Sequence, residues 1–387
     1  MKITIITSFP FPNGKATANR MRVFAEELLK NKRIDSIDIV CSSGDANQHS
    51  NFTHNIKIIN IMGNSVNKNN YILRAFKELL LSIELWRAAY KTNSEIYIVS
   101  IPSILLLLPI IFFKKPKLLV LDIRDAVWTY FSKGFISNSL KKIIEYTFKL
   151  ASKKANILSV TNKSEALIVK NIQDINPIIV PNGISEKKLI EVSKAAQKSS
   201  VNNKNINITY IGNVGIAQKL EILLNFCKKD YENVSINIIG DGAQLKHLKN
   251  QAKIENIKNI NFFGAVPPEN VLEFMENADV LFAQIGGDFS SAVPTKIFEY
   301  IASGRRVLLG LPDGPAKDIF KDFYGVEIFN TGDIHDFQIS YNRLIEKELS
   351  EVEIKFNLNR LKSNYVREKS MHNFLIHFDK LLNDSFL

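Results

Sequence analysis

Short apolar segments alternate with amphipathic segments along most of the chain, and this alternation constrains the fold more than any other feature. Residues 2–7 (KITIIT) predict a buried strand, and residues 18–31 predict a helix with Met21, Phe24 and Leu28 on one side. Apolar strands that alternate with helices are typical of a parallel sheet covered by helices on both faces. The same pattern predicts strands at 36–42, 55–61, 95–100, 117–123, 156–161, 206–212, 235–242, 260–266, 279–286 and 306–311.

A polar, lysine-rich stretch from 184 to 205 interrupts the alternation, which then restarts. A chain of 387 residues is also longer than one small core needs. We therefore predict two α/β domains, 1–183 and 206–356, joined by a linker at 184–205 and followed by helices at 357–387. Two such domains imply a cleft between them, where ligands bind beyond the carboxyl ends of the strands.

The formal net charge of +11 leaves nucleic acid, anionic lipid and phosphorylated substrates as partner classes. Because no strand alternates aromatic and basic residues in the manner of an RNA-binding module, we expect no nucleic-acid partner. Cys41 and Cys227 lie far apart, and the six histidines form no H-x-x-x-H array. We expect no metal site, no disulfide framework and a reducing compartment.

The apolar run at the amino terminus ends at Pro10, which favours a strand and loop over a signal peptide. Residues 104–113 (ILLLLPIIFF) are about half as long as a membrane span, and they favour a buried helix over a membrane-dipping segment. Residues 70–91 and 140–154 combine apolar residues with several lysines or arginines. Such helices either rest on anionic lipid or pack on a core with their basic side in water, so peripheral membrane association stays open beside a purely cytoplasmic protein.

The stretch SSAVPTKIFEYIASGRRVLLG, from 290 to 310, predicts a loop, a helix at 295–303 and a buried strand. Pro294 suits the first position of the helix, and Gly304 suits the residue just past its end. Lys296 and Glu299 then share one face. Lys296 and the amino end of the helix suit a phosphate, and Glu299 suits the hydroxyls of a ribose, which together make a nucleoside diphosphate clamp. The alternative is an exposed Lys–Glu pair, worth a few tenths of a kcal/mol.

Three glycine-bearing turns follow predicted strands: FPFPNGKATANR, YIGNVGIAQK and IIGDGAQL. Glycine allows close approach of the backbone to a ligand, but many strand-to-helix turns need it for packing alone. None of the three has the G-x-G-x-x-G or G-x-x-x-x-G-K-[ST] spacing of a dinucleotide or P-loop site.

In order, these turns, LDIRDAVW, IIVPNGI, INFFGAVPPENVLEFMENADVLF and VPTKIFEYIASGRRVLL resemble the glycosyltransferases of family 4. The resemblance covers nearly the whole chain. It implies the GT-B fold: two Rossmann-like parallel-sheet domains that face a central cleft, with a C-terminal helix that crosses back to the first domain. It also implies an acceptor-binding first domain, a donor-binding second domain, and a retaining sugar transfer without a metal ion or other cofactor.

By this resemblance Glu299 matches the ribose-binding second glutamate of an E-x7-E motif. The first glutamate is replaced by Ser291, as in the branch that writes P-[ST]-K-x-x-E-Y, where the lysine contacts phosphate. Asn213 and Gln218 stand where many members carry an arginine and a lysine, so we infer that Lys296, helped by Lys219, takes the charge of the leaving diphosphate. The residues expected on the donor side are Gly14, Gly212, Asn213, Lys219, Gly240, Asp241, Gly242, Gly264, Val266, Thr295, Lys296 and Glu299.

On the acceptor side the resemblance points to Arg20, Arg124 and Asp125. Asp125 would orient or deprotonate the acceptor hydroxyl, and with Lys296 it forms the expected catalytic set. The alternatives are an Arg124–Asp125 pair that tethers the strand end, and an Arg20 that lies on a solvated face.

We therefore expect a retaining hexosyltransferase that uses a UDP- or GDP-sugar and a saccharide or lipid-linked saccharide acceptor, in bacterial surface polysaccharide synthesis. Its expected location is the cytoplasm, with the inner face of the plasma membrane as the peripheral alternative. A GT-B nucleotide-sugar epimerase, which would form product without an acceptor, and a non-catalytic scaffold subunit, which would bind no nucleotide, remain as alternatives.

Overall fold

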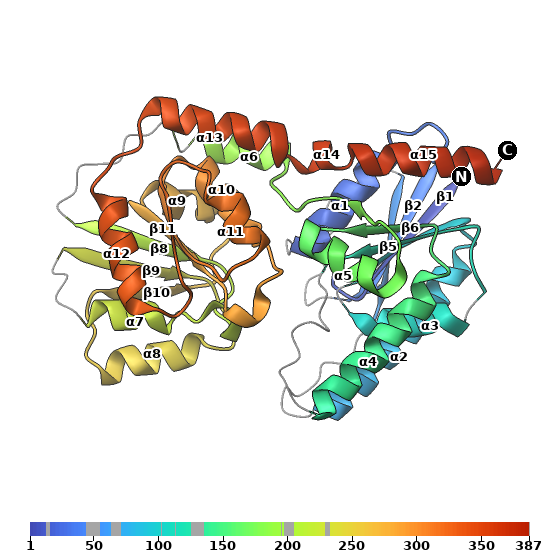
Figure 1. Cartoon of the computed structure of the whole chain (residues 1–387), viewed down its shortest axis with the longest axis horizontal. Coiled ribbons are helices and arrows are strands. Elements are labelled where there is room, and N and C mark those ends of the chain that lie inside the picture. The colour runs from blue at the N-terminus through green and yellow to red at the C-terminus, as the bar shows by residue number, and fades with distance from the viewer. Residues whose placement is uncertain are drawn as a thin grey trace. The chain divides into compact units, whose positions relative to one another are not determined.

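The chain forms two compact units, and each contains one parallel sheet with helices on both faces (Figure 1). The first unit comprises residues 1–182 and 367–387, and the second comprises residues 183–366. The computed structural model describes residues 1–12, 16–43, 55–62, 71–101, 103–112, 114–124, 135–194, 196, 205–228 and 233–386.

The first unit has a seven-stranded sheet in the order β3-β2-β1-β4-β5-β6-β7, and every pairing in it is parallel. Its strands are β1 (Lys2–Thr7), β2 (Ser36–Ser42), β3 (Ile56–Ile61), β4 (Ile96–Ile101), β5 (Leu118–Ile123), β6 (Ile157–Val160) and β7 (Ile178–Ile179). Its helices are α1 (Ala16–Leu28), α2 (Tyr71–Lys91), η1 (Ile104–Leu106), α3 (Leu107–Phe112), α4 (Phe135–Ser152), α5 (Lys163–Gln173), α14 (Arg367–Ser370) and α15 (His372–Phe386).

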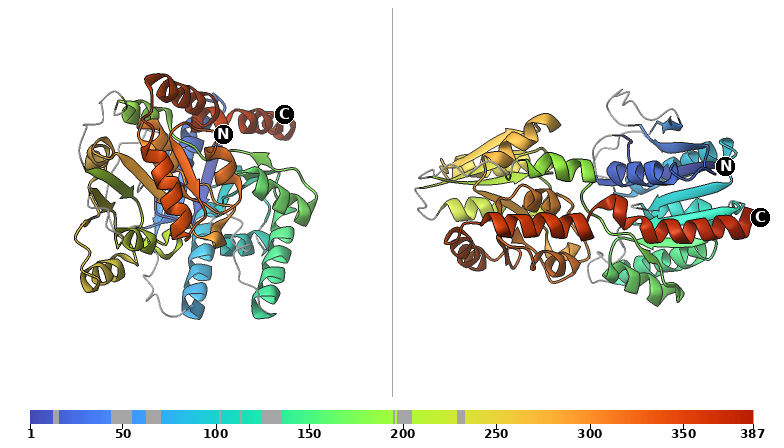
Figure 2. Two further views of the ribbon diagram at one scale, coloured as in Figure 1. Left: turned by 60° about the vertical axis from the view of Figure 1, so that its left-hand side comes forward. Right: turned by 90° about the horizontal axis from the view of Figure 1, so that it is seen from above.

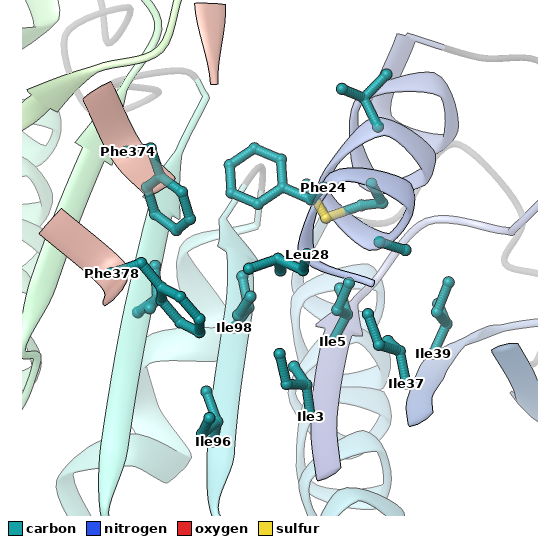
Figure 3. Close-up of a cluster of buried hydrophobic side chains, with 14 of the residues drawn as sticks. Ile3, Ile5, Phe24, Leu28, Ile37, Ile39, Ile96, Ile98, Phe374 and Phe378 are labelled. Atoms are coloured by element: carbon teal, nitrogen blue, oxygen red, sulfur yellow. The ribbon is translucent and has the colours of Figure 1, made fainter. Parts of the chain in front are cut away.

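Both faces of the first sheet are apolar because its strands carry near-continuous Ile, Leu and Val. Helices α1 and α15 cover one face, where Phe24 packs edge-on against Phe374 with ring centroids 5.0 Å apart (Figure 3). Helices α2, α3, α4 and α5 cover the other face. The return of the C-terminal helix to the first unit is thus confirmed, and it is driven by burial of Phe374, Phe378 and Leu382.

The greasiest stretch of the sequence forms η1 and α3, with Leu106, Leu107 and Ile110 buried. The expected buried helix is therefore confirmed for this segment, although Phe112 at its end is 84% exposed.

The second unit has a six-stranded parallel sheet in the order β10-β9-β8-β11-β12-β13. Its strands are β8 (Ile206–Ile211), β9 (Val234–Ile239), β10 (Ile260–Gly264), β11 (Val280–Gln284), β12 (Arg306–Gly310) and β13 (Val326–Phe329). Its helices are α6 (Glu186–Ser193), η4 (Ile216–Gln218), α7 (Glu221–Cys227), α8 (Leu245–Ile254), η5 (Pro268–Asn270), α9 (Val271–Glu276), η6 (Gly287–Phe289), α10 (Lys296–Ala302), α11 (Pro315–Phe320), α12 (Ile334–Ile345) and α13 (Glu351–Asn364). One face packs against α6, α9, α10, α11 and α13, and the other packs against α7, α8 and α12 (Figure 2).

The limits of the units differ from the predicted boundaries at two places. Within the expected linker at 184–205, helix α6 buries Leu189 and Val192 in the core of the second unit. The segment expected to pack on the first domain from residue 357 stays with the second unit until Val366, because Leu361 of α13 is fully buried there. The chain passes from one unit to the other twice, after Asn182 and after Val366. The segments at these two points lie side by side, because Ile184 N donates a hydrogen bond to Tyr365 O at 3.0 Å.

Candidate functional site

The strand order of the second sheet changes direction between β8 and β11, the two strands at its centre. In open parallel sheets, ligands bind beyond the carboxyl ends of the strands at such a switch point. The loops that leave this point are residues 212–220 after β8 and residues 285–295 after β11. Half of the predicted donor-side residues lie in these two loops and in α10, which follows the second loop.

Glycines hold the loops after β8, β9 and β10 against one another. Gly240 N donates to Gly264 O at 2.7 Å, and Gly212 N donates to Ile239 O at 2.9 Å. A Cβ on Gly240, whose φ is +137°, would lie 1.7 Å from Gly212 O. Close backbone packing therefore already requires glycine at position 240, whether or not a ligand also approaches.

The GDG turn after β9 packs against the loop after β8. Val214 N donates to Asp241 O at 2.9 Å, and a Cβ on Gly242 would lie 2.4 Å from Val214 O. The exposed Asp241 carboxylate accepts the N–H of Gly242 at 2.7 Å. The structure thus brings together Gly212, Asp241 and Gly242, as the sequence predicts for one edge of a site.

The two neutral residues at the expected basic positions bond to each other. Asn213 Nδ2 donates to Gln218 Oε1 at 3.3 Å, and the same oxygen accepts from Gly215 N at 3.1 Å. The hydroxyl of Tyr210 donates to Asn213 O at 2.6 Å, and burial raises the pKa of Tyr210 well above its ordinary value. Asn213 and Gln218 therefore shape this loop and bring no positive charge to it.

Lys219 supplies a positive charge in this loop, and a buried amide fixes its backbone. Lys219 adopts a left-handed conformation with φ at 43°. The side-chain amide of Gln284, at the end of β11, donates to Gln218 O at 3.1 Å and to Lys219 O at 2.8 Å. Gly286 lies beside the Lys219 side chain, because a Cβ there would be 3.2 Å from Lys219 Cε. The switch point thus joins the two central loops around Lys219.

Sequence analysis did not identify Gln284. Its side chain is 2% exposed, and its Oε1 makes no hydrogen bond to any residue that the structure describes. The available signal was one polar residue at the end of the otherwise apolar segment VLFAQ.

A tyrosine hydroxyl fastens α10 to the end of β8. Tyr300 is fully buried, and its hydroxyl donates to Ile211 O at 2.9 Å and accepts from Ile211 N at 3.0 Å. Burial raises the pKa of Tyr300 well above its ordinary value. Since Glu299 precedes Tyr300 and Gly212 follows Ile211, this contact places the start of α10 beside the loop after β8.

Lys296 and Glu299 lie half-buried in the first turn of α10. Neither side chain makes a hydrogen bond or ion pair with any of the described residues, so the two are not paired with each other. Thr295 occupies the N-cap position without a side-chain cap bond, and Pro294 precedes the cap and does not occupy the first helical position as predicted. Because α10 has only seven residues, its dipole is small, and Lys296 is the stronger source of positive charge.

Phe263 and Gly264 end β10, and Val266 lies in the loop that follows; Gly264 and Val266 belong to the predicted donor side. Phe263 is 49% exposed and packs edge-on against Phe274, with ring centroids 4.9 Å apart. Gly264 has φ at 73°, and a Cβ there would meet nothing within 4 Å. Val266 is partly buried against the core of the second unit. An open aromatic face and an unobstructed glycine are compatible with a stacked planar ligand.

Arg20 has a different environment from either prediction. It is 5% exposed, so it neither lies on a solvated face nor has a free guanidinium for an acceptor. Its Nε and Nη2 donate to the two oxygens of Asp122 at 2.9 and 2.7 Å, and its Nη1 donates to Val180 O at 2.8 Å. Ser159 Oγ also donates to Asp122 at 2.7 Å. This buried bidentate pair ties α1 to β5 and to the chain just after β7.

The other first-unit candidates are described only in part. Arg124 directly follows β5 and is buried, with 9% exposure. Gly14 and Asp125 lie outside the residues that the structure describes, and so does Trp128 of the same motif.

Among the described residues, no cluster of His, Cys, Asp or Glu could hold a metal ion. In the same part of the chain, no helix combines the length and the apolar character that crossing a bilayer requires.

Comparison with known proteins places this geometry in context. Residues 191–360 match the family model described as glycosyl transferases group 1. The fold is similar to sucrose-phosphate synthase from Thermosynechococcus elongatus, at 12% identity and a TM-score of 0.78 over 99% of both chains. It is also similar to Anabaena HepE in complex with UDP and glucose, at 12% identity and a TM-score of 0.68 over 98% and 99% of the chains. The lipopolysaccharide outer core galactosyltransferase WaaB matches at 17% identity and a TM-score of 0.63, over 98% and 100% of the chains.

Curated protein sequences give no match. Identities this low show the fold alone. The whole chain therefore has the GT-B fold, and the part that is similar to the glycosyl transferases group 1 model lies within the second unit.

Proposed function

We propose that the protein transfers a hexose from a UDP- or GDP-sugar to a saccharide or lipid-linked saccharide, with retention of configuration and without a metal ion or other cofactor. The observation that carries this proposal is the state of Lys296 and Glu299. Both are half-buried at the switch point of the second sheet, and among the described residues neither has a partner. A half-buried cation and anion that leave each other unpaired are available to a ligand with a phosphate and vicinal hydroxyls.

The donor would bind along the edge formed by the loops after β8, β9 and β10. In this proposal Glu299 accepts hydrogen bonds from the ribose hydroxyls, and Phe263 and Val266 lie beside the base. Gly212, Asn213, Gly240, Asp241 and Gly242 form the backbone wall, and Gly264 leaves space beside it. Thr295 and Lys296 face the diphosphate, and Lys219 approaches it from the other central loop.

Glycosyl transfer needs the charge of the leaving diphosphate to be stabilised more in the transition state than in the ground state. The bond between the anomeric carbon and the diphosphate oxygen breaks, and the acceptor oxygen bonds to the same carbon from the face that the diphosphate leaves. Lys296 and Lys219 would stabilise the developing negative charge as point charges. The acceptor proton passes to a phosphate oxygen of the donor or to a carboxylate base.

Asp125 is our proposal for that base, and Arg124 for an acceptor contact. The buried pair of Arg20 with Asp122 supports these roles of Arg124 and Asp125 indirectly. Arg20 fixes Asp122, which lies two residues before Arg124 on β5, so it would position the acceptor residues without contacting the acceptor. Gly14 of the FPNG loop is proposed to adjoin the donor.

The choice of substrates rests on the proteins of similar fold. The printed descriptions of these proteins include HepE with UDP and glucose, TarM with UDP, and two proteins of lipopolysaccharide synthesis, WaaB and WaaG. They support a nucleotide-sugar donor and a role in surface polysaccharide assembly, which we propose takes place in the cytoplasm and at the inner face of the plasma membrane.

The direct test is incubation with UDP- and GDP-sugars, with and without a saccharide acceptor, in EDTA, with NMR of the products. We expect a new glycosidic bond with the anomeric configuration of the donor, and only when acceptor is present. A changed sugar without acceptor would point to an epimerase, and an inverted linkage would contradict the retaining mechanism.

A further inference from the structure

The positive charge of the chain belongs to one unit. Residues 1–182 and 367–387 contain 28 lysines and arginines against 16 aspartates and glutamates, whereas residues 183–366 contain 22 against 23. The first unit therefore has a formal net charge of +12 and the second has −1. Such asymmetry indicates that the first unit meets an anionic surface.

Helix α2 exposes several apolar side chains in its first half. Leu73, Phe76 and Leu80 are 45%, 56% and 46% exposed, and their spacing of three and four residues places them on one side. The core-facing residues of α2, which include Leu85 and Trp86, point to the opposite side and belong to its second half. Further along the exposed side, the helix becomes basic with Arg87 and Lys91, beside Glu84, which pairs with Arg87 at 2.7 Å.

Helix α4 repeats this arrangement. Ile143 and Tyr146 are 61% and 64% exposed, and Leu140 is 42% exposed one turn earlier. The residues of α4 that pack into the core, Ile144 and Phe148, lie on another side. Lysines lie close to the exposed apolar residues of α4, with one glutamate among them: Lys141, Lys142, Lys149 and Glu145.

Among the described residues of the first unit, the first halves of α2 and α4 extend together beyond the other elements, as two views show (Figures 1 and 2). We call their exposed apolar residues the α2–α4 tip: Leu73, Phe76 and Leu80 with Leu140, Ile143 and Tyr146. We propose that the α2–α4 tip inserts into the interface of an anionic lipid bilayer, with the surrounding lysines and arginines at the level of the headgroups.

The chemistry of the tip favours a bilayer over other occupants. Amphipathic helices with basic residues around an apolar face lie in the membrane interface, bound by apolar burial and by attraction to anionic lipid. The exposed residues of the tip come from two separate helices and include both aliphatic and aromatic side chains. A fluid bilayer can accommodate such a divided apolar contact. The inference rests on the proposed function insofar as a lipid-linked acceptor would be presented at that surface.

Flotation of the full chain with vesicles tests the proposal. Vesicles of phosphatidylglycerol mixed with phosphatidylcholine are compared with pure phosphatidylcholine, at about 0.05 M and about 0.5 M salt. We expect binding to the anionic vesicles, weakened at least tenfold by the higher salt, and little binding to the neutral ones.

Two pairs of variants locate the contact. The double variant Phe76→Ser/Ile143→Ser is expected to lower vesicle affinity at least tenfold. The double variant Lys77→Glu/Lys142→Glu is expected to lower vesicle affinity by more than the roughly fivefold that one basic residue contributes. The matched controls lie on the second unit: Ile254→Ser, at a residue that is 84% exposed, and Lys249→Glu on the exposed side of α8. Both controls are expected to bind as the wild type does.

The proposal is overturned if the wild type ignores anionic vesicles, or if the tip variants bind them as well as the controls do. It is also overturned if ultracentrifugation shows a dimer that only the tip variants disrupt and vesicles do not recruit the chain. Thermal stabilisation by UDP or GDP is measured on the same variants. It distinguishes a failure of the membrane proposal from a failure of the proposed glycosyl transfer. Retained nucleotide binding without vesicle binding removes the docking surface alone, and the reverse result removes the proposed donor site alone.

Discussion

The amide of Gln284 holds the backbone of the turn that carries Lys219. We expect Gln284→Met to remove both donated hydrogen bonds at nearly constant volume and to cost about 1–3 kcal/mol of the free energy of unfolding. The left-handed conformation of Lys219 would lose its support, and UDP or GDP affinity should fall about tenfold by calorimetry. Gln251→Met on α8 is the matched control, since among the described residues the Gln251 side chain bonds only to Glu255 in the next turn. Unchanged nucleotide affinity in Gln284→Met would show that the turn does not serve the donor.

At the scale of the element, α10 depends on the Tyr300 hydroxyl for its position. Tyr300→Phe leaves the N–H and C=O of Ile211 without this partner, so we expect a loss of about 1–3 kcal/mol in urea unfolding. Tyr324→Phe is the control, because Tyr324 is 47% exposed. If both variants unfold alike, the hydroxyl does not anchor α10.

The same hydroxyl predicts a dependence on pH. Burial raises the pKa of Tyr300 in the folded chain above the value of about 10 for an exposed tyrosine. Above that pH the unfolded chain releases the proton and the folded chain keeps it, so the free energy of unfolding should fall as the pH rises. The free energy of unfolding of Tyr300→Phe should fall less steeply with pH than that of the wild type, between about pH 9.5 and 11. Parallel slopes for the two proteins would contradict this account.

At the scale of the whole molecule, the Arg20–Asp122 pair belongs to the first unit alone. Arg20→Leu leaves a fully buried carboxylate without its cation, which typically costs about 3–5 kcal/mol. We expect faster hydrogen exchange in α1 and β5 and unchanged exchange in the second unit. Arg87→Leu, which breaks an exposed pair with Glu84, should change stability by less than about 1 kcal/mol. Equal effects of the two substitutions would mean that the buried pair does not hold the first unit together.

The apolar runs of the sequence were sufficient to place most strands, because a strand buried on both faces requires continuous Ile, Leu and Val. The segments KITIIT and SIDIVCS are the observed β1 and β2. The crossing after Val366 was not predictable, because α13 and α15 both mix charged and apolar residues. Only the tertiary contacts of Leu361 and Phe374 assign these two helices to different units.

Only part of the candidate site was predictable, because some of its residues depend on tertiary contacts. Lys296 and Glu299 follow from spacing on one short helix, whereas Arg20 and Gln284 take their roles from partners more than sixty residues away. A single sequence does not reveal such partners, so Arg20 was assigned to an acceptor and Gln284 was missed.

The central claim is that Lys296 and Glu299 form a nucleotide clamp, and thermal unfolding with UDP, GDP, ADP and CMP in turn tests it most directly. At about 100 times its dissociation constant, one ligand should add about 2.7 kcal/mol to the free energy of unfolding of the wild type. We predict this stabilisation for UDP or GDP, its loss in Glu299→Ala, and its retention in Glu273→Ala, a control on the exposed side of α9. If no nucleotide stabilises the wild type, or if Glu299→Ala is stabilised equally, the clamp does not exist.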